Sequence, residues 1–138
     1  MGQLGVVVML NQLFGDNQSS IDAVRSALGK RIAEVSLGND DALHFVMEDG
    51  FKFKIFDDGQ SCCEHRYMTT DDDIQSYVGS TFKGAEIKSA PSIVEEDSYE
   101  EHDVEFLEIQ TDRGVFTMAN HNEHNGYYGG FSVKAQAE

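Results

Sequence analysis

Two short segments hold most of the side chains in this chain that could do chemistry. The first places two thiols, a carboxylate, an imidazole and a guanidinium in consecutive positions: Cys62, Cys63, Glu64, His65 and Arg66. The second gathers two imidazoles and two phenols: His121, His124, Tyr127 and Tyr128. No apolar periodicity explains either segment, so together they form the candidate functional cluster.

Thiols and imidazoles first suggest zinc, which takes four such ligands in a tetrahedron. The spacing argues against a zinc site, because structural sites use C-x₂₋₄-C and H-x₃₋₅-H, whereas Cys62 and Cys63 are adjacent. Neighbouring side chains of a strand also point to opposite faces, so both thiols could hardly reach one ion. We therefore predict no metal ion and no cofactor.

The same residues supply the parts of an activated nucleophile, a thiolate beside an imidazole that Glu64 or Glu123 could orient. The chain has no nucleophile elbow, protease signature or glycine-rich phosphate loop, however. Arg66 could equally pair with Asp57 or Asp58. We assign no catalytic residues and keep a small Cys/His enzyme or metal-binding protein as the alternative.

The charge of the chain points to a different kind of partner. Its 138 residues carry a net charge of −15, and such a surface repels phosphate backbones, which argues against direct nucleic-acid binding. It favours a basic protein partner, or it serves solubility alone. Adjacent cysteines form no disulfide framework, which fits a reducing cytoplasm, and no apolar run is long enough to span a membrane.

Apolar residues alternate with polar ones through three predicted strands, Ala33 to Leu37, Leu43 to Met47 and Phe51 to Ile55. Before them, Ser19 or Ser20 is expected to cap a short helix that ends at Gly29. Between the second and third strands, Asp49-Gly50 predicts a type I′ hairpin turn.

The pattern then begins again. Thr70 is expected to cap a second helix with Asp71, Asp72 and Asp73 in its first turn, followed by a strand that ends at Ile87 and a hairpin around Gly114. Val115 and Thr117 would correspond to Phe51 and Phe53, and a last strand is expected from Phe131. The alternative is chance similarity between short strands with turn glycines.

We therefore predict a single α+β domain over residues 1–138, rich in antiparallel strands and built from two pseudo-equivalent helix–strand–hairpin halves. Residues 1–19 form an N-terminal extension, 20–69 the first half, and 70–138 the second half with an acidic insertion at 95–103. We expect the insertion to be a solvated loop, because carboxylates at that density bury little apolar area.

The two chemical segments also resemble those of an uncharacterised family of small proteins, found largely in bacteriophage genomes and in bacteria. The resemblance rests on Gly59-Gln60-x-Cys62-Cys63-Glu64-x-Arg66-Tyr67-Met68 and on His121-Asn122-Glu123-His124-Asn125-Gly126-Tyr127-Tyr128, and it covers about residues 28 to 134. It implies a phage or prophage accessory protein in the host cytoplasm, and it carries no activity or site residue.

These observations favour a non-enzymatic acidic module that binds a basic host or phage protein, as an inhibitor of a host nucleic-acid-handling protein. A minor structural or assembly protein of a phage particle is a further alternative. The candidate partner-binding patch combines the start of the predicted second helix with the insertion: Asp71, Asp72, Asp73, Glu95, Glu96, Glu100 and Glu101. The sequence leaves the oligomeric state open.

Overall fold

Two antiparallel sheets dominate the computed structural model, which describes residues 18–58, 64–89, 93–94, 101–124 and 131–138. The four-stranded sheet has the order β1 (Ile32–Leu37), β2 (Ala42–Met47), β3 (Lys52–Asp57) and β9 (Val133–Ala137). The five-stranded sheet has the order β4 (Glu64–Thr69), β8 (Gly114–His124), β7 (Glu101–Thr111) and β5 (Phe82–Ser89), with β6 (Ile93–Val94) beside β7. The α+β class and the antiparallel pairing are as predicted.

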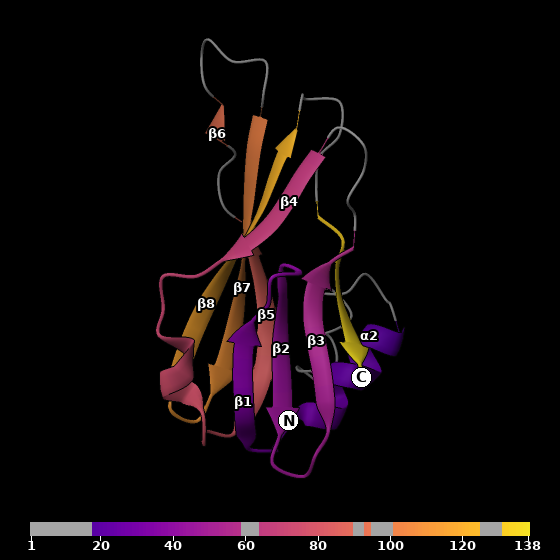
Figure 1. Cartoon of the computed structure of the whole chain (residues 1–138), viewed down its shortest axis with the longest axis vertical. Helices are drawn as coiled ribbons and strands as arrows, with labels where there is room; N and C mark the ends of the chain where they lie inside the picture. The colour runs from indigo at the N-terminus through magenta and orange to yellow at the C-terminus, as the bar shows by residue number, and fades with distance from the viewer. Residues whose placement is uncertain (1–17, 59–63, 90–92, 95–100, 125–130) are drawn as a thin grey trace.

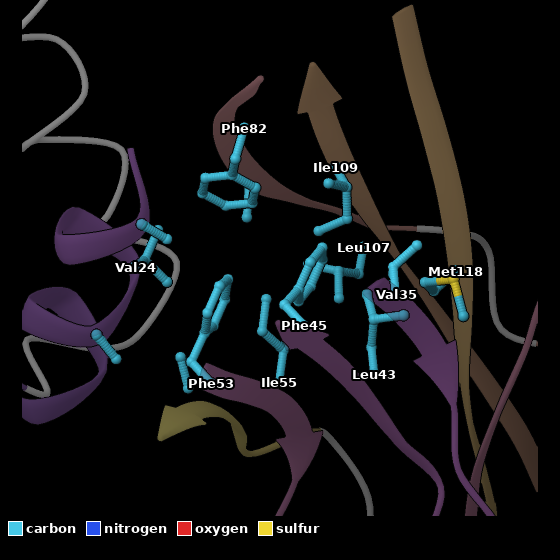
Figure 2. Close-up of a cluster of buried hydrophobic side chains, with 14 of the residues drawn as sticks. Val24, Val35, Leu43, Phe45, Phe53, Ile55, Phe82, Leu107, Ile109 and Met118 are labelled. Atoms are coloured by element: carbon cyan, nitrogen blue, oxygen red, sulfur yellow. The ribbon is translucent and has the colours of Figure 1, made fainter. Parts of the chain in front are cut away.

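The core lies where the lower parts of the two sheets face each other (Figure 1). Phe45 and Phe53 stack with ring centroids 4.7 Å apart, and Phe82 of the five-stranded sheet meets both of them edge-on. Figure 2 shows these rings together with Leu107 and Ile109 of β7, which are fully buried. Most inward residues of the predicted alternation therefore form the core, but in β1 Ile32 is buried in place of the expected Ala33.

The helix α2 (Gln18–Ala27) packs Ile21 and Val24 into this core, as the spacing of those residues predicts. It begins before both serines, so neither has the expected capping position. Ser20 is buried instead, and its hydroxyl oxygen accepts a hydrogen bond of 3.1 Å from the Ala135 amide of β9. The helix ends before Gly29, whose φ of +82° lies in the left-handed region.

The predicted second helix is wrong: a single 3₁₀ turn, η1 (Ile74–Tyr77), stands in its place. The reason is tertiary. The Asp72 carboxylate accepts a hydrogen bond of 2.7 Å from the Thr117 amide, and the Thr70 hydroxyl donates one of 2.7 Å to the Thr117 carbonyl. Both side chains are thus bound to β8 and do not cap a helix, and only one turn remains before Gly79.

The β2–β3 turn also differs from the prediction. It is a three-residue loop, Glu48 to Gly50, in which the Phe51 amide donates to the Asp49 carboxylate and only Gly50 has a positive φ, +91°. A type I′ turn needs two positive φ angles, so the structure uses the three-residue hairpin with one left-handed glycine.

The β7–β8 turn is one residue shorter, because Thr111 pairs with Gly114 directly. The expected match of Val115 and Thr117 with Phe51 and Phe53 is therefore wrong by one position. Phe116 and Met118 are the buried apolar residues of β8, whereas Val115 is 48% exposed.

The two sheets share one strand order. In each sheet, three neighbouring strands come from one half of the chain, β1-β2-β3 or β5-β7-β8. The fourth strand comes from the other half, β9 or β4. Backbone hydrogen bonds between the two halves are reciprocal. The Gly29 amide donates to the Phe82 carbonyl at 2.9 Å, and the Gly79 amide donates to the Ile32 carbonyl at 2.7 Å. The register irregularities fall at Ile32/Glu34 and at Phe82/Gly84, which begin at the same distance after Gly29 and Gly79.

One part of the five-stranded sheet has no counterpart in the other. Strands β7 and β8 have 11 residues each, whereas β2 and β3 have 6. The additional length pairs with β4 and projects beyond the four-stranded sheet (Figure 1). We call it the extension: residues 64–68, 101–105 and 120–124. Residues 101–103 of the expected acidic loop therefore lie in a strand, because they pair with β8.

Candidate functional site

The register of β4 against β8 brings the two chemical segments side by side. His65 lies opposite Glu123, Arg66 opposite Asn122, and Tyr67 opposite His121. The backbone of Glu64 pairs likewise with that of His124. The remaining members of the predicted cluster lie outside the described residues: Cys62, Cys63, Tyr127 and Tyr128.

The pleat of the sheet divides this cluster between two faces. Side chains alternate along a strand, so His65 and Tyr67 share one face while Arg66 and Met68 share the other. Met68 is part of the core, which defines the second as the inner face. The predicted cluster of His65, Arg66 and His121 is thus separated by the sheet itself, with both imidazoles on the outer face.

On the outer face, three rings form a continuous row. The His121 imidazole lies parallel to the Tyr67 ring, with centroids 4.5 Å apart and 6° between the planes. His65 contacts the same phenol ring at 4.8 Å, and its Nδ1 lies 3.4 Å from a Glu123 carboxylate oxygen. At the other end of the row, His121 Nε2 lies 2.8 Å from the Thr69 hydroxyl oxygen.

The row is held together by ring contacts, and its phenol is protonated. Both imidazoles contact the phenol ring of Tyr67, and no group of three or more potential metal-binding side chains occurs in the described ranges. Partial burial and the negative charge of Glu123 raise the pKa of Tyr67 above its ordinary value, so the phenol stays protonated at neutral pH. A protonated phenol donates a hydrogen bond and is a poor nucleophile.

The inner face of the extension is polar and buried. Arg66 donates to both oxygens of Asp57, at 2.9 and 2.8 Å, which confirms one of the two partners expected for it. Asn120 and Asn122 are almost fully buried beside this pair in the register. Burial and the charge of Asp57 raise the pKa of Glu105, which lies opposite Asn120. This layer joins the extension to the sandwich.

The sequence analysis missed Glu105, Asn120 and Asn122. A signal for the two asparagines exists, because they continue the alternation of the buried Phe116 and Met118. Polar residues at inward positions of a strand indicate a buried polar layer.

At the foot of the extension, a pocket of about 220 Å³ opens on the outer face. Ligand pockets for drug-sized molecules have about 300 to 1,000 Å³, so this one suits a single side chain or a small group. Phe106 is 37% exposed there. The lining combines this ring, small residues of β8 and the start of the segment after β4: Thr69, Thr70, Asp71, Asp72, Phe106, Thr117 and Ala119.

Comparison with known families identifies one that matches most of the chain. Residues 25–134 match the model of a family described as Domain of unknown function (DUF7448). The chain belongs to this family. The match includes every strand from β1 to β8, and with them the row of rings and the pocket. Neither the curated proteins nor the solved structures include a match.

In this DUF7448 domain two described members of the predicted acidic patch, Asp72 and Glu101, lie apart. Asp72 is bound to β8 at Thr117, whereas Glu101 pairs with His124, seven positions further along the strand. At about 3.4 Å per residue the two places are roughly 24 Å apart. Glu95, Glu96 and Glu100 lie outside the described residues, so the combined patch stays a prediction. Within the described chain, no helix has the length and apolar character needed to cross a bilayer.

Proposed function

We propose that this DUF7448 domain is a non-enzymatic acidic module that docks a basic segment of another protein on the outer face of its extension. The observation that carries the proposal is the row of three rings, His65, Tyr67 and His121, on the outer face of the extension, the part of the five-stranded sheet that has no counterpart in the four-stranded sheet. Tyrosine is a favoured anchor in protein interfaces, because a large rigid ring carries one polar group.

The charges around this face support a basic partner. The whole chain has a net charge of −15, and the face itself carries Glu108 and Glu123 beside the acidic rim of the pocket. Lys88, on the same face, is held by Glu108 at 3.3 Å. An acidic surface accelerates encounter with a basic partner, and salt weakens this effect over distances beyond about 8 Å.

The finer identity of the partner is part of the same proposal. A basic, nucleic-acid-handling protein of a bacterial cytoplasm fits both the charge and the resemblance to phage-borne proteins. The Cys/His enzyme or metal-binding alternative depends on Cys62 and Cys63, which lie outside the described residues, and it stays a prediction.

We also propose that the two sheets descend from one duplicated unit. The shared strand order, the reciprocal hydrogen bonds of Gly29 and Gly79, and the matching register irregularities support a duplication. Duplication accounts for the two sheets. The extension is the part in which the five-stranded sheet departs from the four-stranded sheet. A departure of this kind is where a specialised function is expected.

The test is capture of proteins from bacterial lysate by the wild type and by two matched variants. His65→Ser with His121→Ser removes both imidazoles of the row. His44→Ser removes an imidazole of the four-stranded sheet that lies 2.9 Å from the Asp40 carboxylate. We expect a basic protein to be captured at low salt and released at high salt, with capture lost only in the outer-face variant. Capture that ignores salt, or that fails equally in both variants, contradicts the proposal.

A further inference from the structure

Phe106 holds an unusual position for a large apolar side chain. It lies on the outer face of β7, between Lys88 of β5 and Ala119 of β8 in the register, and it is 37% exposed. The Lys88 ammonium is directed to Glu108 by an ion pair of 3.3 Å. The cation next to Phe106 in the register is therefore already paired, and the Phe106 side chain lines the pocket.

The rim of this pocket is acidic and in part rigid. Asp72 accepts a hydrogen bond of 2.7 Å from the Thr117 amide, while its own amide donates to the Thr70 hydroxyl at 3.1 Å. The Thr70 hydroxyl in turn donates to the Thr117 carbonyl, so three hydrogen bonds fix the Asp72 carboxylate beside β8. The neighbouring Asp71 is exposed and makes no hydrogen bond or ion pair within the described part of the chain.

The pocket lining that the structure describes contains two carboxylates and no Lys or Arg side chain. Two aspartates next to an exposed aromatic ring, without a cation of their own, complement a positive group that can also lie flat. A guanidinium meets both requirements, because it is planar, stacks on aromatic rings and binds carboxylates through paired N–H donors. An ammonium is a strongly hydrated point charge that supplies no flat surface.

We infer that the pocket bounded by Phe106, Asp71 and Asp72 binds an arginine side chain of the partner. The guanidinium stacks on the Phe106 ring and donates to the Asp71 carboxylate, and the aliphatic stem lies on Ala119 and the methyl of Thr117. The volume of about 220 Å³ suits one such side chain. This inference rests on the proposed function, since it names the group that a basic segment inserts at the foot of the extension.

The inference can be tested with the full-length domain and short peptides, without the natural partner. The probes are acetyl-Gly-Arg-Gly-amide, its lysine analogue and its citrulline analogue, which has nearly the shape of arginine but no charge. Backbone amide signals are followed by two-dimensional NMR during each titration. The Thr117 amide, which donates to Asp72, is the natural reporter. We expect saturable shifts of Thr117 and Asp72 with arginine, at least about threefold weaker binding with lysine, and no shifts with citrulline.

Four variants locate the site. Asp71→Asn and Phe106→Leu should each weaken arginine-peptide binding at least about fivefold. The controls remove a carboxylate and an apolar side chain elsewhere, Glu48→Gln in the β2–β3 turn and Val115→Ala on the same outer face, and should leave binding unchanged. Equal shifts with citrulline, or equal losses in the controls, would overturn the inference.

The outcomes separate this inference from the proposed function. If capture of a basic protein depends on His65 and His121 but survives both pocket variants, and the arginine peptide leaves Thr117 unshifted, then the outer face docks a partner without an arginine in the pocket. If the peptide titrates as expected but no basic protein is captured, then the pocket stands and the proposed function fails.

Discussion

Arg66 of β4 and Asp57 of β3 join the two sheets through an ion pair, in which Nη1 of Arg66 lies 2.9 and 2.8 Å from the two carboxylate oxygens and the side chains are 7% and 8% exposed. Asp57 also accepts a hydrogen bond of 3.0 Å from the Ser132 amide, just before β9. The pair therefore lies near the beginnings of β4 and β9. These are the two strands that the halves exchange between the sheets.

Removing one partner of this pair should destabilise the domain strongly. Arg66→Met leaves the buried Asp57 carboxylate without its guanidinium, and the loss expected for such a pair is about 3 to 5 kcal/mol. Asp57→Leu combined with Arg66→Met should recover most of that loss, because two apolar side chains leave no buried charge. Urea unfolding of the single and double variants measures both values. A double variant as unstable as the single one would contradict this account.

Glu105 should make the stability of the domain depend on pH. Its pKa is raised by burial and by the charge of Asp57, so the folded state holds the proton more tightly than the unfolded state does. The stability that this provides is present below the ordinary value of 4.5 and is lost as the pH rises through the raised pKa. Glu105→Gln should therefore exceed the wild type in free energy of unfolding at pH 7, and the difference should disappear in acid.

A carboxylate with the opposite shift gives the control. Hydrogen bonds from Lys30 and from the Phe51 amide lower the pKa of Asp49, so its contribution is present at neutral pH and is lost as the pH falls through the lowered pKa. Asp49→Asn should be less stable than the wild type at pH 7, and this gap should also close in acid. Urea unfolding at several pH values checks both signs, and equal signs in the two variants would contradict the assignment.

The shorter β7–β8 turn decides which residue of β8 faces the core. Phe116 is fully buried and touches the Tyr77 ring at 4.9 Å, whereas Val115 is exposed. Phe116→Ala should cost about 3 to 5 kcal/mol, and Val115→Ala should stay within about 0.5 kcal/mol of the wild type. Thermal or urea unfolding compares them. The reverse order would restore the alignment of Val115 with Phe51 that the sequence favoured.

The strands that bury one clear apolar face were predictable. The alternation through Val35, Phe45 and Phe53 is strict, and β1, β2 and β3 follow it to within one or two residues. Strand β4 was not predicted, because neither of its faces is wholly apolar. His65 and Tyr67 lie on the outer face, and Arg66 and Met68 lie on the inner face. A strand without an apolar face gives no periodic signal.

Long-range contacts account for the other differences. The sequence around Thr70 has good helix-capping chemistry, but nothing local shows that Asp72 will bind Thr117, 45 residues away. The same holds for the candidate site. Pairing of the two chemical segments depends on β4 joining the sheet of the other half, and alternation along one strand carries no information about its neighbour. The strands with one apolar face were therefore predictable, and the exchange of β4 and β9 between the sheets was not.

This exchange leads to the last prediction. Cut between Thr69 and Thr70, the chain yields two fragments. The first holds the paired strands β1, β2 and β3, the second the paired strands β5, β6, β7 and β8, and each also holds one strand whose pairing partner is in the other fragment, β4 or β9. Alone, each fragment lacks one edge of its sheet and the facing half of the core, so neither should give a cooperative unfolding transition. Mixed in equal amounts, they should form a heterodimer with the circular dichroism of the intact domain, measured together with sedimentation velocity. Met68→Asp, which places a carboxylate at a buried position of β4, should abolish the association. A fragment that folds cooperatively as a monomer would show that strand exchange is not required for folding.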